Sequence, residues 1–135
     1  MSTYLISGQK WGDPTGYTTG GQVTWSFATT VGDLINFDYQ ITEPEFRNLI
    51  RDAFAAWEAY LDIDFVEVSD SSSVDIRLGW DAIDGQSGTL GEAVYSYQYT
   101  TSEYDSLTQA EIRFDWAENW TSDADYTGGT YENFY

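Results

Sequence analysis

One amphipathic helix between alternating segments constrains the fold of this chain more than any other feature. Apolar side chains recur three and four positions apart between Phe46 and Leu61, the spacing that places them on one face of a helix. The segment Thr42-Glu43-Pro44-Glu45 precedes this stripe. It predicts the helix start, because it combines a capping threonine with an early proline and a glutamate three positions after the cap. We therefore expect one long helix packed against a sheet.

Alternating segments on both sides of the helix supply the sheet. The segment QVTWSFAT (22–29) precedes the helix, IDFVEVS (63–69) and VDIRLGW (74–80) follow it, and 89–116 contains two aromatic-rich strands joined by a polar loop. A strand, a helix and a second strand in this order predict a right-handed parallel crossover. The expected fold is therefore α+β, a twisted mixed sheet of about five strands with the helix on one face. Residues 1–135 are expected to form a single domain.

The charge of the chain limits the classes of partner that it can bind. The formal net charge is −18, with only five Lys and Arg against 23 Asp and Glu. Such a surface repels nucleic acid and anionic membranes, so we expect neither as a partner. No apolar run approaches membrane-spanning length, and residues 1–10 lack the basic-then-apolar pattern of a cleavable signal peptide.

Two absent residue types limit the chemistry. The sequence contains no cysteine, which excludes disulfides and thiolate metal sites, and no histidine, the commonest zinc ligand and general base. These two absences exclude most hydrolytic machinery and leave carboxylate chemistry. A glycosidase uses a pair of carboxylates, but acidic residues are so abundant here that no spacing singles out one pair.

Five segments, taken in order, resemble the metzincin zinc metalloendopeptidases. The opening ISGQKWGDPTGYTTGGQVTWSF resembles that of serralysin-like members, and FRNLIRDAFAAWEAYLDIDFVEV and VDIRLGW resemble their first helix and next two strands. The stretch DGQSGTLGEAVY is similar to the matrixin pattern Asp-Gly-x-x-Gly-x-Leu-Ala-His-Ala-Phe. RFDWAENWT is similar to the matrixin His-Phe-Asp-Asp-Asp-Glu-x-Trp-Thr.

The resemblance implies the N-terminal, substrate-aligning half of a metzincin catalytic domain from a secreted, bacterial, serralysin-like enzyme. The sequence is expected to end before the H-E-x-x-H helix, so it carries no catalytic residue and is inactive alone. The complete enzyme would use zinc to hydrolyse peptide bonds, with peptides or proteins as substrates and the missing C-terminal half as a partner. The alternative is a stand-alone calcium-stabilised binding module derived from the same fold. An extracellular location is expected in either case.

The resemblance also implies a structural calcium ion between the acidic glycine loop and the end of the last strand. Independently, a glycine loop that can turn carbonyls inward, combined with three carboxylates, forms a hard oxygen site of the calcium type. The alternative is an acidic loop without a metal. The implied ligands are Asp84, Gly85, Gly88, Asp115 and Glu118.

Two further expectations come from the aromatic-rich strands. Glu92 and Arg113 stand where matrixins carry histidines of a structural zinc site. We therefore expect a cross-strand ion pair in place of that metal; the alternative is that both side chains point into solvent.

The first of these strands matches the family's substrate-binding edge strand, where an extended peptide adds to a sheet, although a plain sheet edge is the other interpretation. The edge residues implied are Thr89, Leu90, Gly91, Ala93 and Val94.

Overall fold

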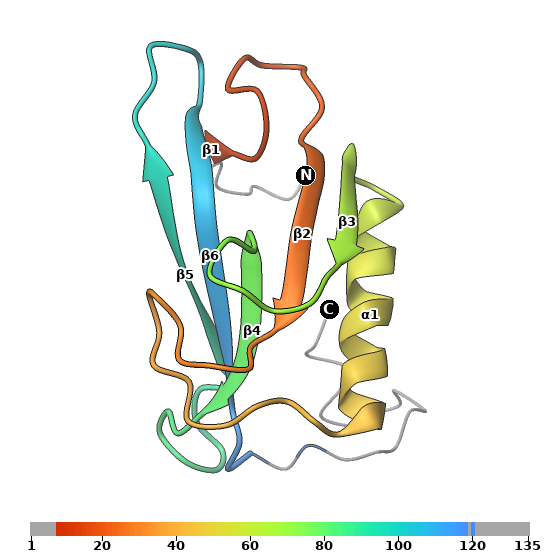
Figure 1. The fold of residues 1–135 in the computed structure, drawn as a ribbon, viewed down its shortest axis with the longest axis vertical. Coiled ribbons are helices and arrows are strands. Elements are labelled where there is room, and N and C mark those ends of the chain that lie inside the picture. Colours follow the sequence, from red (N-terminus) through yellow and green to blue (C-terminus); the bar gives the residue numbers. More distant parts are fainter. Residues whose placement is uncertain (1–7, 119, 121–135) are drawn as a thin grey trace.

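The computed structural model describes residues 8–118 and residue 120. It contains one helix and a six-stranded sheet (Figure 1). The elements in chain order are β1 (Gln9–Lys10), β2 (Gly21–Phe27), α1 (Pro44–Glu58), β3 (Ile63–Glu67), β4 (Ile76–Asp81), β5 (Gly91–Gln98) and β6 (Asp105–Asp115). The α+β class agrees with the prediction. The sheet exceeds the predicted strand number because the two-residue β1 is too short to leave a periodic pattern.

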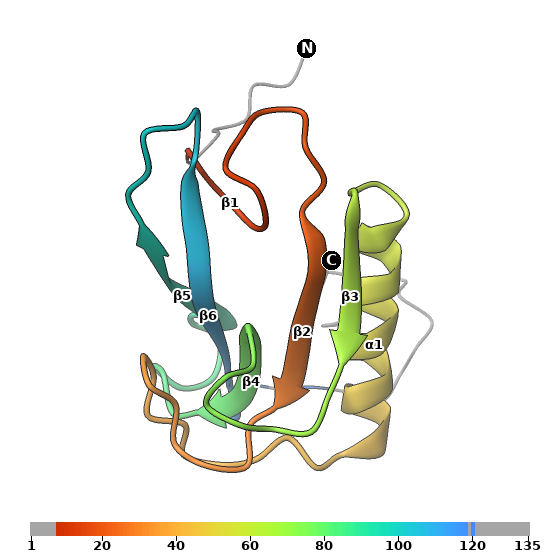
Figure 2. The same cartoon turned by 45° about the horizontal axis from the view of Figure 1, so that its top comes forward.

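The sheet is mixed, as expected. Its strand order is β1-β6-β4-β2-β3, with every pair on this path parallel, and β5 pairs antiparallel with β6. The helix connects β2 to the neighbouring parallel strand β3. Figures 1 and 2 both show β5 beside β6, at the side of the sheet away from the helix. Among the described strands, β5 pairs with β6 alone and is an edge strand.

The helix begins one residue later than the sequence pattern predicted. Glu43, not Thr42, is the N-cap residue, and its side chain makes no capping bond. The Glu43 carboxylate instead accepts hydrogen bonds from the Thr42 N–H at 3.0 Å and from Trp80 Nε1 at 2.9 Å. The predicted capping box of Thr42 and Glu45 was therefore wrong, because the cap lies one residue later, at Glu43, whose carboxylate is held by Trp80 of β4. The helix ends at Glu58, so Tyr60 and Leu61 lie beyond it, 87% and 41% exposed.

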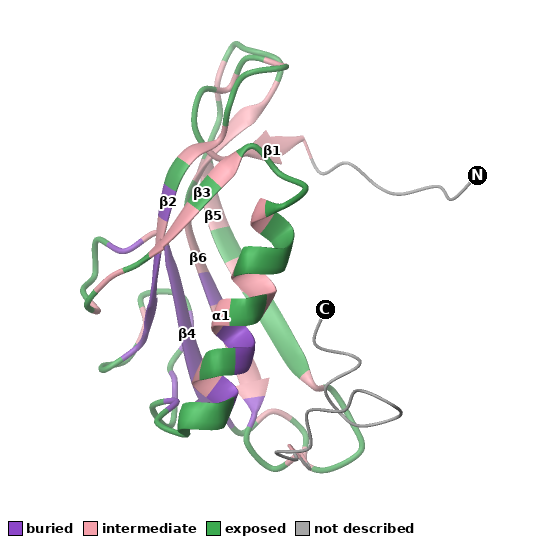
Figure 3. Ribbon diagram, turned by 90° about the vertical axis from the view of Figure 1, so that its right-hand side faces the viewer, coloured by how far each residue is buried: buried purple, intermediate pink, exposed green. Residues whose placement is uncertain are grey.

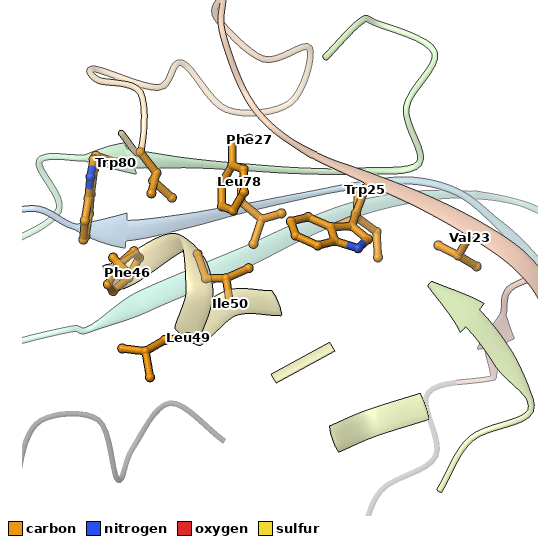
Figure 4. Close-up of a cluster of buried hydrophobic side chains, with 10 residues drawn as sticks. Val23, Trp25, Phe27, Phe46, Leu49, Ile50, Leu78 and Trp80 are labelled. Atoms are coloured by element: carbon orange, nitrogen blue, oxygen red, sulfur yellow. The ribbon is translucent and has the colours of Figure 1, made fainter. Parts of the chain in front are cut away.

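The main core lies between the helix and one face of the sheet. In Figure 4 the helix side chains Phe46, Leu49 and Ile50 lie alongside residues of β4 such as Leu78 and Trp80. Phe46 and Trp80 approach with ring centroids 4.4 Å apart. Burying side chains of this size stabilises a fold by about 1.5–3 kcal/mol each, so this contact fixes the helix on the sheet. Figure 3 shows the helix covering that face and the exposed surface of β5 beyond it.

The opposite face of the sheet is also covered, which the sequence pattern did not predict. The alternation in VDIRLGW predicted Val74, Ile76 and Leu78 inward and left Arg77 outside the core, but Arg77 is 1% exposed. Residues 28–37 pass over this face, where Phe37 lies so close to Gly79 that a Cβ there would meet the ring at 2.5 Å. The loop closes a second, smaller core, and β4 is buried along its whole length.

Three charged side chains hold this loop in place. Arg77 pairs with Asp70 at 2.8 Å, and its guanidinium lies 3.9 Å from Glu111 on the adjacent strand. Glu111 is fully buried and accepts the backbone N–H groups of Asp33, Leu34 and Ile35 at 2.5–3.1 Å. Buried carboxylates need such partners because desolvation otherwise disfavours the charge. The charged row on β4 and β6 is therefore structural.

No helix in the described part of the chain is long and apolar enough to cross a membrane.

Candidate metal centre and peptide-binding edge

Three carboxylates converge where the sheet meets the loop between β4 and β5. Asp84 lies in that loop, Asp115 is the last residue of β6, and Glu118 follows three residues later. One carboxylate oxygen of each lies within 4.8 Å of the others. Asp115 is fully buried, Glu118 is partly buried and Asp84 is exposed. The structure thus brings together the carboxylates singled out in the sequence, although Asp84 and Asp115 are 31 positions apart along the chain.

The loop presents backbone N–H groups to these carboxylates. Asp115 accepts the N–H groups of Asp84 and Gly85 at 3.1 and 3.0 Å. Glu118 accepts those of Ser87 and Gly88 at 3.0 and 2.9 Å. The sequence-based expectation gave this stretch a different role, the supply of carbonyl ligands. In the structure the loop instead donates N–H groups to the carboxylates. These dipoles relieve the mutual repulsion of the converging negative charges.

Two glycines are required for this loop geometry. Gly85 has a φ of +85°, a left-handed conformation that residues with a Cβ adopt at a cost. A Cβ at Gly88 would meet Asp84 Oδ1 at 2.5 Å. The glycine spacing read in the sequence is therefore a steric requirement of the carboxylate cluster.

The electrostatics of the cluster suit a hard divalent cation. Burial alone would raise the pKa of Asp115, but hydrogen bonds from the N–H groups of Ala117, Asp84, Gly85 and Ile83 outweigh it and lower that pKa below its usual range. Asp115 is thus ionised at neutral pH. Like charges 4.8 Å apart repel by about 1–3.5 kcal/mol per pair, for dielectric constants between about 80 and 20. An all-oxygen donor set under this repulsion fits calcium, which takes carboxylate and carbonyl oxygens.

Arg113 connects the neighbouring strands beside this cluster. It stands opposite Glu92 in the β5–β6 register, and its Nη2 lies 2.5 Å from Glu92 Oε2. Its Nη1 donates to Asp81 Oδ2 at 2.8 Å. The pKa of Arg113 is raised, first by the hydrogen bond to Asp81 and then by the one to Glu92. Asp81 was missed in the sequence, because the alternating segment was ended at Trp80, whereas β4 extends to Asp81.

The edge of β5 is divided between structural and open backbone groups. Thr89 donates its N–H to Asp84 at 2.9 Å, and the Leu90 carbonyl accepts from Asp115 at 2.9 Å. Backbone hydrogen bonds in an antiparallel pair recur at every second residue. Glu92 and Val94 therefore also direct their backbone N–H and C=O groups toward β6. Gly91, Ala93 and Tyr95 therefore direct their backbone groups outward.

Contacts on the far side of β6 support this assignment. Residues 110, 112 and 114 lie opposite Tyr95, Ala93 and Gly91, and the Ala110 N–H donates to Asp75 beside β4 at 2.8 Å. The backbone groups of Ala110 thus point away from β5. Of the five predicted edge residues, Gly91 and Ala93 remain with backbone groups directed to the open edge, and the Val94 side chain packs against Ala28, Ile35 and Phe37.

Comparison with known proteins places this geometry in a family. The family model described as Matrixin matches residues 19–133, which spans the helix, the carboxylate cluster and the edge strand. The chain belongs to the matrixin family. It is 28% identical over 105 residues to Karilysin of Tannerella forsythia, an alignment that covers 72% of this chain and 21% of Karilysin. The chain thus spans about a fifth of the length of that curated relative.

Membership of the matrixin family supports the coarser part of the resemblance read in the sequence. Matrixins are metzincin-type metalloproteases that use zinc and calcium. The serralysin-like features of the first strand stay a prediction.

Proposed function

We propose that this chain is the N-terminal, substrate-aligning and calcium-stabilised part of a secreted zinc metalloendopeptidase. The observation that carries the proposal is the convergence of Asp84, Asp115 and Glu118 within 4.8 Å at the start of an open edge strand, in a matrixin-family chain. A cation at the cluster would tie the loop before β5 to the end of β6. The rigid strand that follows would then align a peptide backbone.

The catalytic zinc centre does not fit the residues of this chain. A catalytic zinc site needs three protein ligands, usually histidines, and the sequence has neither histidine nor cysteine. We therefore assign no catalytic residue here, and we expect the chain alone to be inactive. Residues 1–135 are proposed as a single N-terminal subdomain, and a segment that carries the zinc ligands as its partner.

The Glu92–Arg113 pair is proposed as a replacement for the matrixin structural zinc. It joins β5 to β6 at 2.5 Å, and Asp81 extends the link to β4. An ion pair joins strands as the metal would, but it needs no zinc supply. An extracellular, bacterial, serralysin-like enzyme remains the proposed source, and the strongly acidic composition of the chain is compatible with an extracellular location.

Calcium titration of the purified chain tests the metal site. We expect Ca²⁺ to raise the unfolding midpoint of the wild type, because it binds the folded cluster and not the separated carboxylates. At about 100 times Kd the gain would be about 2.7 kcal/mol. Asp115→Asn should abolish this response, whereas Asp52→Asn on the exposed side of α1 should retain it. Equal midpoints with and without Ca²⁺ at constant ionic strength would refute the calcium site.

A stand-alone calcium-stabilised binding module is the second candidate function. It is favoured by the complete lack of histidine in a chain whose edge strand and carboxylate cluster are already formed. Reading the source gene beyond codon 135 separates the two functions. A following H-E-x-x-H motif supports the protease, and an immediate stop codon supports the module.

A further inference from the structure

A row of tyrosines continues the open edge of β5. Tyr95 and Tyr97 are spaced two residues apart on β5 and so project from the same face of the strand, and Tyr99 follows just beyond the end of β5. Their ring centroids are 6.3 and 5.3 Å apart in succession, and the hydroxyls of Tyr97 and Tyr99 lie within 3.4 Å. Tyr95 is 48% and Tyr99 82% exposed. We call these three residues the tyrosine strip.

The row along β5 changes from small to large side chains. Gly91 and Ala93 occupy the same face before Tyr95. A peptide strand added beside Gly91 and Ala93 meets open backbone groups and little side-chain bulk. The same peptide, continued past Tyr95, would lie beside aromatic rings.

The negative charge of Asp105 acts on the tyrosine strip. The pKa of Tyr97 is raised, first by its hydrogen bond with Tyr99 and further by the negative charge of Asp105. The five cations of the chain all bond elsewhere, so none neutralises the strip. Lys10 binds oxygens of residues 11–19, Arg47 binds the Ile41 carbonyl, and Arg51, Arg77 and Arg113 bind Glu67, Asp70 and Asp81.

We propose that the tyrosine strip binds arginine side chains of an extended peptide that adds to the edge of β5. Aromatic faces attract cations, and the planar guanidinium stacks on rings better than an ammonium does. The tilts between successive rings are 39° and 77°, so the rings do not form the flat platform that would suit stacking on sugar rings. The inference rests on the proposed function and names its substrate class, a basic segment beyond the residues aligned by Gly91 and Ala93.

The test uses a fluorescein-labelled decapeptide of alternating Thr and Arg, and its Thr-Lys counterpart, with fluorescence anisotropy as the readout. Binding is measured at about 0.15 M salt, where charges more than ~8 Å apart are largely screened. We expect Tyr95→Thr/Tyr97→Thr/Tyr99→Thr to weaken binding of the arginine peptide about tenfold, as three exposed cation–aromatic contacts are lost. The single variant Tyr99→Thr, at the most exposed ring, should weaken it about threefold.

Two further variants separate the strip from exposed tyrosines elsewhere and from the edge of β5. Tyr39→Thr/Tyr60→Thr removes tyrosines that are 58% and 87% exposed outside the strip, and it should bind like the wild type. Ala93→Pro removes an N–H that faces away from β6 and should block strand addition without breaking the β5–β6 ladder.

Each outcome has a defined meaning. Loss of binding in the strip variants but not in Tyr39→Thr/Tyr60→Thr supports the inference, as does a preference for arginine over lysine. Wild-type affinity in the strip variants with loss in Ala93→Pro overturns the strip and leaves the aligning edge intact. Equal binding by all variants, or no binding by the wild type, overturns the role of the tyrosine strip and of the β5 edge in peptide binding. The calcium titration judges the metal site of the proposed function independently.

Discussion

Arg113 shows how a single charge on a strand can link three strands. Its guanidinium binds Asp81 on β4 and Glu92 on β5 from its own position on β6. The two partners differ in their surroundings, because the Asp81 side chain is 11% exposed and that of Glu92 46%. Exposed pairs contribute little and buried ones cost much when broken. The Asp81 contact is therefore the stronger constraint on Arg113.

A double-mutant cycle on Glu92 and Arg113 measures the cross-strand pair. We expect a coupling of about 0.5 kcal/mol between Glu92→Gln and Arg113→Met, since the glutamate is nearly half exposed and solvent screens the pair. Arg113→Met alone should cost more than Glu92→Gln alone, because it also leaves Asp81 without its cation. Urea unfolding of the four proteins supplies the free energies. A coupling indistinguishable from zero would contradict the pairing.

The sequence indicated Glu92 and Arg113 because full charges on half-buried strands need partners. It also indicated the carboxylates of the cluster, because glycines and acids were spaced as in a known family. It missed the N–H groups that approach Asp115 and Glu118. Backbone direction in a loop depends on dihedral angles such as the φ of +85° at Gly85, and residue type alone does not specify them.

At the scale of elements, β4 is the strand whose environment the sequence described least well. Its alternation correctly placed Ile76 and Leu78 toward the helix but gave no sign that Arg77 would also be covered. Residues 28–37 cover it from a distant part of the chain. Periodicity reports which face is apolar and does not report a polar face buried under a loop. The prediction of the helix start was wrong for a similar reason. The Glu43 side chain bonds to Trp80, which lies far away in the sequence.

Asp70 is the residue through which this buried face responds to pH. Burial alone would raise its pKa, but the bonds from Arg77 and from the Thr29 N–H and the hydroxyls of Ser26 and Thr29 hold it well below its usual range. A depressed pKa gives stability that is present above the unfolded pKa of about 3.9 and lost as pH falls toward the folded value. The contribution should be constant near neutrality and decline only below about pH 4.

Asp70→Asn should lower the free energy of unfolding by about 3–5 kcal/mol at pH 7, because it leaves the Arg77 charge buried without its main partner. The difference from the wild type should shrink below about pH 4, where the wild type begins to protonate Asp70. Denaturant unfolding at a series of pH values measures this difference. Asp52→Asn, at an exposed position on α1, is the matched control and should change stability by less than about 0.5 kcal/mol. A difference that grows on acidification would contradict the assignment.

At the scale of the whole molecule, a net charge of −18 on 135 residues acts against the compact state. The fold counters this repulsion locally, through the loop N–H groups at Asp115 and Glu118 and the arginine-centred pairs on β4 and β6. Other described carboxylates, such as Glu45, Asp52 and Asp64, are exposed. Screening by salt and binding of a cation at the cluster should therefore stabilise the chain by separate routes.

Sodium chloride should raise the unfolding temperature, because the Debye length falls from about 30 Å at 0.01 M to about 10 Å at 0.1 M and the surface repulsion weakens with it. A gain of about 1 kcal/mol would appear as a rise of roughly 4 °C for a chain of this size. The rise should level off as the repulsion becomes screened, whereas the Glu92–Arg113 coupling should decrease over the same range. Differential scanning calorimetry of the wild type and Asp115→Asn tests both routes. Both proteins should respond to sodium chloride, and only the wild type should gain further from Ca²⁺ at constant ionic strength. An unfolding temperature that falls with added salt would show that attractive surface pairs, and not the excess of carboxylates, dominate the electrostatics of this fold.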